Sequence, residues 1–190
     1  MYMSSNQIKK NTKLNPEWVY KSAINYLGKY SSSSSNLSRF LERKSLKLLP
    51  KTDLEMSEIK SWIKITIEKL ENLKLLNDKD FAKSKALSLF KKGKSSRAIN
   101  AKLKSLGICD DYIMEAMTNL IYNFSDDKSE ENLDYKAAQV FAKKKNFFPI
   151  EPKVNSNSQK NKIIQSFARA GFSYNTIRKF INFNLTDYDN

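Results

Sequence analysis

Apolar residues recur along almost the whole chain at the three- and four-residue spacing of an amphipathic helix. In residues 57–77 they form one stripe, which consists of Ile59, Trp62, Ile63, Thr66, Ile67, Leu70 and Leu73. A second stripe contains Ala82, Ala86, Leu89 and Phe90. Only 4 glycines and 4 prolines interrupt 190 residues, which argues against a sheet with many tight turns. We therefore expect an all-α protein of about nine helices.

Charged residues mark the ends of the helix that carries the second stripe. Asp78 and Asp80 stand at its start, and Lys91 and Lys92 stand at its expected end. This order matches the helix dipole, and the following Gly93 is a residue type that ends helices. We therefore expect one helix that reaches as far as Lys92.

Two stretches of the chain repeat each other at a constant offset of 64 residues. Residues 103–117 align with residues 167–181, so that Gly107 falls on Gly171 and Ile108 on Phe172. Upstream, residues 80–92 resemble residues 134–145 with an offset of 54, which places an insertion of 10 residues within 146–159.

A weaker first copy lies in residues 18–44, where Leu37 and Leu41 take the places of Ile99 and Leu103. The serines at 31–35 are expected to hold a turn and to cap the next helix. We predict a flexible N-terminus (1–15) and three tandem three-helix repeats over 16–76, 78–123 and 131–187. Small helical repeats bury their apolar faces by stacking, so we expect an elongated, curved array.

The chain is strongly basic, with a net charge of +14 and an isoelectric point near 9.7. This balance favours an anionic partner such as nucleic acid or an acidic protein surface. There is no histidine and one cysteine, Cys109, so the commonest general base, a disulfide and a thiolate zinc cage are excluded. We expect no catalytic residues, no metal and no cofactor, and we assign Cys109 a capping or packing role.

No apolar run in the chain is long enough for a signal peptide or a membrane span. We therefore expect a cytoplasmic monomer without a membrane partner.

The order and spacing of several short motifs resemble the RecX family of bacterial regulators of the RecA recombinase. The motifs are the opening Ala23–Leu27, the turn Ser33–Leu37, Leu76–Ala82, Lys91–Gly93, Ile99–Ile108, Ile113 and Ala116–Met117. Three positions depart from the family pattern: Lys102 and Asn36 replace glutamates, and Ser105 replaces a basic residue. The resemblance implies a helical repeat protein of DNA repair, recombination and the SOS response, which binds the RecA–DNA filament and usually inhibits it, without catalysis or cofactor.

Basic residues on the expected outer faces of the helices are the candidate contacts with such a filament. Lys85 and Lys92 are seven residues apart, as are Arg97 and Lys104, and no acidic residue lies between Phe90 and Ile108. The full candidate set consists of Lys85, Lys91, Lys92, Lys94, Arg97, Lys104, Lys143, Lys144 and Lys145. A solvated basic face is the plain alternative, and an uncompensated cluster, which repels itself, favours binding over it.

Two further alternatives stay open at this point. The chain could bind DNA weakly and without sequence preference, single- or double-stranded, independently of a recombinase. Inhibition and support of the filament are also not distinguished by the sequence. A base-reading helix-turn-helix is disfavoured, because its second helix would begin with Asp110 and Asp111 and would repel phosphates. These aspartates, like Asp126 and Asp127, suit helix N-termini.

The large aromatic residues lie mostly on the apolar stripes. We therefore expect core packing and not base stacking for Trp18, Trp62, Phe81, Phe141 and Phe167.

Overall fold

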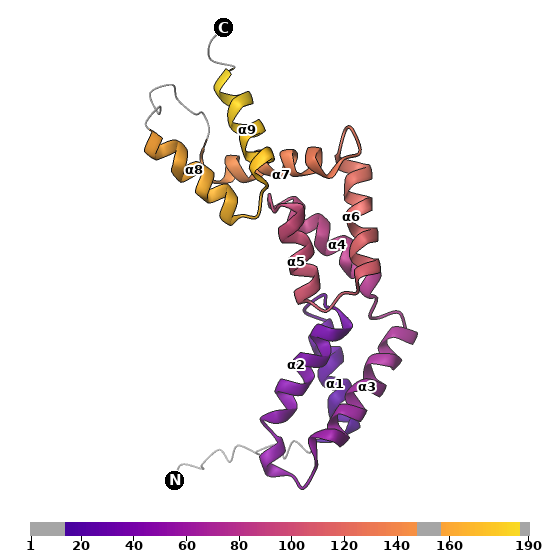
Figure 1. Cartoon of the computed structure of the whole chain (residues 1–190). Coiled ribbons are helices and arrows are strands. Elements are labelled where there is room, and N and C mark those ends of the chain that lie inside the picture. Colours follow the sequence, from indigo (N-terminus) through magenta and orange to yellow (C-terminus); the bar gives the residue numbers. More distant parts are fainter. Residues whose placement is uncertain (1–13, 148–156, 187–190) are drawn as a thin grey trace, which may run out of the picture. The chain divides into compact units, whose positions relative to one another are not determined.

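The fold is known from a computed structural model that describes residues 14–147 and 157–186. The expected flexible segment 1–15 and the insertion within 146–159 lie mostly outside these residues. Every regular element in the described ranges is helical, which confirms the all-α prediction (Figure 1). The elements are α1 (Pro16–Leu27), α2 (Ser34–Leu46), a 3₁₀ turn η1 (Leu49–Lys51), α3 (Met56–Asn72), α4 (Asp78–Phe90), α5 (Ser96–Ser105), α6 (Asp110–Phe124), α7 (Glu130–Lys144), α8 (Asn157–Arg169) and α9 (Tyr174–Thr186).

The chain divides into two compact units, which meet in sequence between Asn77 and Asp78. In the N-terminal unit, α1, α2 and α3 pack on one another. Their buried faces share one core, which contains Val19, Ala23, Leu37, Leu41, Ile59, Ile63, Leu70 and Leu76. Asn15 and Ser33 begin α1 and α2, because each side chain accepts a hydrogen bond from a backbone amide three residues on, at 2.8 and 3.2 Å.

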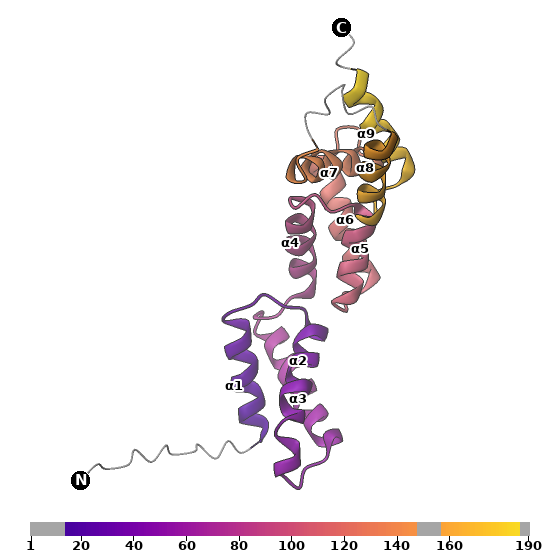
Figure 2. The same ribbon diagram turned by 90° about the vertical axis from the view of Figure 1, so that its left-hand side faces the viewer.

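The C-terminal unit contains α4 to α9 around one continuous core. Helices α4, α5 and α6 pack on one another, and α7 lies across the end of α4 and the start of α5 (Figures 1 and 2). Helices α8 and α9 complete the unit, with α9 against α7. The division of the whole chain into three repeats stays a proposal, which these groups of three helices support.

Burial bears out the 64-residue offset inside the C-terminal unit. Each aligned pair is buried on both sides: Ile99 and Ile163, Leu103 and Phe167, Ile108 and Phe172, Ile113 and Ile177. The aligned glycines Gly107 and Gly171 also share a left-handed backbone, with φ of 77° and 90°. The α5–α6 pair and the α8–α9 pair therefore bury equivalent residues and use an equivalent glycine in the turn between their helices.

The 54-residue offset between α4 and α7 is wrong. It places the buried residues of α4 (Ala82, Ala86 and Phe90) on Lys136, Val140 and Lys144, none of which is buried. A shift two residues shorter places them on Asp134, Ala138 and Ala142, which are all buried. The mismatch arose because the buried face of α7 consists largely of alanines and one aspartate, which leave little hydrophobic contrast in the sequence.

Candidate binding surface

The turn between α4 and α5 carries three of the candidate lysines and has a fixed backbone. Helix α4 ends at Phe90, and the amides of Gly93 and Lys94 donate to the carbonyls of Phe90 and Leu89 at 2.7 and 3.1 Å. This is a Schellman motif, which needs the left-handed φ of 72° that Gly93 supplies. Gly93 therefore ends the helix as predicted. Lys92 is the C-cap residue of this motif, two residues past Phe90, so the regular helix ends earlier than the expected Lys92. That Lys92 shares a helical face with Lys85 stays a prediction.

Gly93 lets this turn pack directly against the backbone of α7. A Cβ atom at Gly93 would lie 2.7 Å from the backbone nitrogen of Phe141 and 2.9 Å from its Cα. Nearby, the Lys144 ammonium group donates to the Lys91 carbonyl at 3.2 Å. The packing brings two segments that are about fifty residues apart in sequence to one place on the surface. We call the result the lysine cluster; its members, all exposed, are Lys91, Lys92, Lys94, Lys143, Lys144 and Lys145.

The start of α5 is fixed by contacts from two other segments. The Ser95 hydroxyl accepts from the amide of Ala98 at 3.2 Å and donates to the carbonyl of Ala170 at 3.1 Å. The next amide, that of Ser96, donates to the buried carboxylate of Asp134 at 2.7 Å. Burial raises the pKa of Asp134 above its ordinary value, and the hydrogen bond from Ser96 opposes that rise. The turn is therefore held by α7 and by the α8–α9 turn together.

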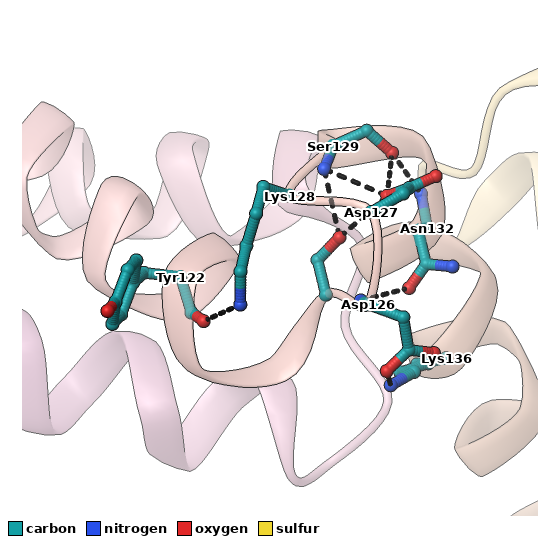
Figure 3. A network of polar contacts seen from close by, with 8 residues as sticks. Tyr122, Asp126, Asp127, Lys128, Ser129, Asn132 and Lys136 are labelled. Carbon is teal, nitrogen blue, oxygen red and sulfur yellow. Dashed lines mark hydrogen bonds and ion pairs between the residues drawn. The ribbon is translucent and has the colours of Figure 1, made fainter.

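A polar network holds the loop that leads from α6 into α7 (Figure 3). The Asp127 carboxylate accepts from the amide and hydroxyl of Ser129 at 2.9 and 2.6 Å and from the Ser125 hydroxyl at 2.9 Å. The bonds from Ser129 lower the pKa of Asp127. Asp126 pairs with Lys136 at 2.7 Å. Both aspartates thus precede α7 instead of standing in its first turn, and they anchor the helix whose other end carries lysines.

Three predicted contacts lie away from the lysine cluster or at its edge. Arg97 is exposed in the first turn of α5, next to the cluster in sequence. Lys85 is only half exposed and lies more than one helical turn before the end of α4. Lys104 lies at the far end of α5, about 13 Å along the helix from Ser95, and pairs with Asp110 at 2.9 Å. The expectation that this stretch has no acidic partner is therefore wrong for Lys104.

The lysines on the first half of α4 are also compensated. Lys79 and Lys83 both contact the Glu115 carboxylate of α6, at 3.0 and 2.8 Å. Hydrogen bonds from Lys83 and Lys79 lower the pKa of Glu115, and the same contact raises the pKa of Lys79. Within the described ranges, by contrast, none of the six cluster lysines forms an ion pair. Their mutual repulsion would be relieved by an anionic partner.

Three other features were candidates for a role in this protein: a metal site, the cysteine Cys109 and a membrane-spanning helix. In the part of the chain that the structure describes, no group of three His, Cys, Asp or Glu residues could hold a metal ion. Cys109 is the N-cap residue of α6, as the expected capping role requires, but it acts through its backbone, because its thiol makes no capping hydrogen bond. The residue is exposed, so a packing role for it is wrong. No described helix combines the length and apolar character that a membrane span requires.

Comparison with known proteins finds a family model and related sequences that all carry the name RecX. A family model described as the second three-helix domain of RecX matches residues 77–117, which include the α4–α5 turn. Regulatory protein RecX of Myxococcus xanthus is 28% identical over 93% of this chain and 90% of its own length. Regulatory protein RecX of Bacillus licheniformis is 29% identical over 90% of this chain, but the match spans 56% of that protein.

Solved structures agree with these sequence matches. RecX from Lactobacillus salivarius aligns with a TM-score of 0.62 and 25% identity over 89% of this chain and 96% of that one. A second structure of a regulatory protein RecX aligns with a TM-score of 0.59 and 17% identity over 90% of this chain and 79% of that one, a likeness of fold.

Proposed function

The chain belongs to the RecX family, and on this premise we propose that it binds the RecA–DNA filament and regulates it. The proposed effect is inhibition of the recombinase and of its ATPase, in DNA recombination and repair. The regulator acts by binding and not as an enzyme. The lysine cluster, with Arg97 at its edge, is the proposed contact. Lys104, which is engaged with Asp110, and the half-buried Lys85 are expected to contribute less.

The packing of Gly93 on the Phe141 backbone is the observation that carries this proposal. It joins two lysine segments into one cluster whose backbone is fixed by hydrogen bonds, without a carboxylate partner among the described residues. A filament of protein on DNA contains a polyanion, because every nucleotide of the DNA carries a negatively charged phosphate. Lysine ammonium groups are mobile point charges that suit many phosphates or carboxylates and no particular base.

Co-sedimentation tests the proposal against binding to DNA alone. RecA filaments are assembled on single-stranded DNA with a nonhydrolysable ATP analogue, and the same DNA without RecA serves as the control. We expect the chain to pellet with filaments at concentrations where it does not bind the bare DNA, and to lower the ATPase rate of filaments supplied with ATP. Equal binding to filament and bare DNA, with an unchanged ATPase rate, would instead support a nonspecific DNA-binding protein.

A further inference from the structure

Aromatic rings and one cation form a continuous row between α1 and α2 of the N-terminal unit. The rings of Tyr26 and Phe40 are stacked with centroids 4.1 Å apart, and the ring of Tyr30 follows at 5.2 Å from Tyr26. At the other end, the Lys44 ammonium group lies 4.8 Å from the Trp18 ring and 6.0 Å from that of Phe40. We call Trp18, Phe40, Tyr26 and Tyr30 the aromatic row.

Hydrogen bonds between the two helices hold this row in place. The Asn36 amide group donates to the Tyr26 hydroxyl at 3.3 Å, and the Lys44 ammonium group donates to the Ser22 hydroxyl at 2.9 Å. The Tyr26 hydroxyl and the Lys44 ammonium group are thus engaged before any ligand arrives, so these two side chains have less conformational entropy left to lose on binding.

The inner and outer members of the row differ in exposure. Trp18, Tyr26 and Phe40 are half-buried and pack against the core, which confirms the packing role predicted for Trp18. Tyr30 is 58% exposed at the end of the row, and its backbone amide donates to the Tyr26 carbonyl at 2.9 Å. The Tyr30 ring is therefore in tilted contact with the Tyr26 ring, at an interplanar angle of 45°, while much of the residue remains open to another planar group.

A stripe of basic residues runs beside the aromatic row on α2. Arg39 and Arg43 of α2 and its C-cap residue Lys47, which keeps a helical backbone, are four residues apart, so they follow one side of the helix, and all three are exposed. We call them the basic stripe. The Arg43 side chain also donates to the Arg39 carbonyl at 3.3 Å, which steadies it along the helix. Within the described part of the chain, Arg43, Lys44 and Lys47 form no ion pair with a carboxylate.

We propose that this face of the N-terminal unit binds a single-stranded polynucleotide, with a base stacked on Tyr30 and the neighbouring phosphates on the basic stripe. An exposed aromatic ring beside exposed cations is the pairing that single-stranded nucleic acids use. An acidic peptide would engage the stripe but not the ring, and a duplex keeps its base faces stacked inside. The site lies on a different unit from the lysine cluster, so it stands or falls independently of the function proposed above.

Stacking is tested with two labelled oligonucleotides of equal length, an oligothymidylate and its abasic analogue, by fluorescence anisotropy with the full chain. Tyr30→Ala should weaken thymidylate binding by about fivefold or more and leave abasic binding unchanged. Tyr30→Phe, which keeps the ring, should bind like the wild type. Tyr174→Ala, which removes a tyrosine that is 69% exposed in the C-terminal unit, is the matched control and should change nothing.

The phosphate contacts are tested with the same two oligonucleotides. The double variant Arg43→Ala and Lys47→Ala should weaken the binding of both oligonucleotides. It should also reduce the slope of log K against log salt concentration by about 1.4, or 0.7 for each contact. The control Lys60→Ala with Lys64→Ala removes two exposed lysines from α3 and should have little effect. The proposal is overturned if the wild type binds both oligonucleotides equally, if Tyr30→Ala and Tyr174→Ala bind thymidylate alike, or if the two double variants weaken binding alike. Unchanged circular dichroism spectra exclude unfolding as the cause of any loss.

Discussion

Gly93 packs so closely on α7 that a Cβ atom there would lie 2.7 Å from the Phe141 nitrogen and 3.1 Å from the Ala137 carbonyl oxygen. The obstructing atoms are backbone atoms of a helix, which cannot rotate away as a side chain could. This contact, together with the left-handed φ of Gly93, ties the geometry of the lysine cluster to one residue that has no charge itself.

Gly93→Ala should therefore destabilise the protein by about 1–3 kcal/mol, because it adds left-handed backbone strain and a clash with α7. Urea denaturation measures the free energy of unfolding. Gly28→Ala is the matched control: Gly28 has a helical φ of −63° and room for a Cβ atom at 3.4 Å from the nearest atom. It should be neutral or slightly stabilising. Equal stability of the two variants would contradict the account of the turn.

The buried Asp134 should make stability depend on pH in a definite direction. Its folded pKa is raised above the ordinary value of 3.8, so the folded state holds the proton more readily than the unfolded state. The free energy of unfolding therefore falls as the pH rises from that value through the folded pKa. Asp134→Asn has no such proton and keeps an oxygen for the Ser96 amide. Its stability relative to the wild type should rise between about pH 3 and about pH 7.

Asp134→Ala serves as the second variant at this position. It removes the acceptor of the Ser96 amide and leaves a buried donor without a partner, which should cost about 1–3 kcal/mol. Denaturation curves across the pH range measure both variants. A stability difference between Asp134→Asn and the wild type that stays constant with pH would show that burial does not perturb this carboxyl.

Two leucines of the same helix end should differ sharply when truncated. Leu103 is fully buried in the core of the C-terminal unit, whereas Leu106 is only partly buried. Leu103→Ala should cost about 2–5 kcal/mol, and Leu106→Ala should cost clearly less because its cavity opens to solvent. Thermal or urea unfolding of both variants gives the comparison. Similar losses would mean that the buried stripe of α5 is misassigned.

The fold was predictable from sequence where large apolar residues repeat. Phe167, Phe172 and Ile177 are large enough to mark the core of the last repeat, and the 64-residue offset predicted their burial correctly. The offset of 54 failed at α7, where Ala138, Ala142 and Asp134 fill the buried positions. Small side chains are buried without a strong hydrophobic signal in the sequence. The match between Asp80 and Asp134, which are 54 residues apart, therefore determined the predicted alignment.

The members of the candidate site were easier to predict than their arrangement. Composition and runs of lysine identified the residues, but the contact that joins Lys91 to Lys144 is made by backbone atoms around Gly93 and Phe141. Such a contact leaves no pattern in one sequence. The pairing of Lys104 with Asp110 was missed because the aspartate lies across a turn from the helix that carries the lysine.

The aromatic row shows the reverse case, in which a signal was present and was interpreted too narrowly. Trp18, Ser22, Tyr26 and Tyr30 are four residues apart, and so are Arg39, Arg43 and Lys47. The first spacing predicts an aromatic face on α1 that Tyr30 continues past its end, and the second a basic face on α2 that ends at its C-cap residue Lys47. Only the packing of α1 on α2 shows that the two faces are neighbours.

Charge reversal of the lysine cluster tests the central claim most directly. The variant with Lys92, Lys94, Lys143 and Lys145 changed to Glu is compared with one in which Lys60, Lys102, Lys160 and Lys162 are changed to Glu; all eight lysines are exposed. Both carry the same change in net charge, and circular dichroism spectra are recorded to check that both fold like the wild type. In co-sedimentation with RecA filaments on single-stranded DNA, we expect the second variant to pellet nearly as the wild type does and the cluster variant to stay in the supernatant. A folded cluster variant that pellets and lowers the ATPase rate like the wild type would contradict the account.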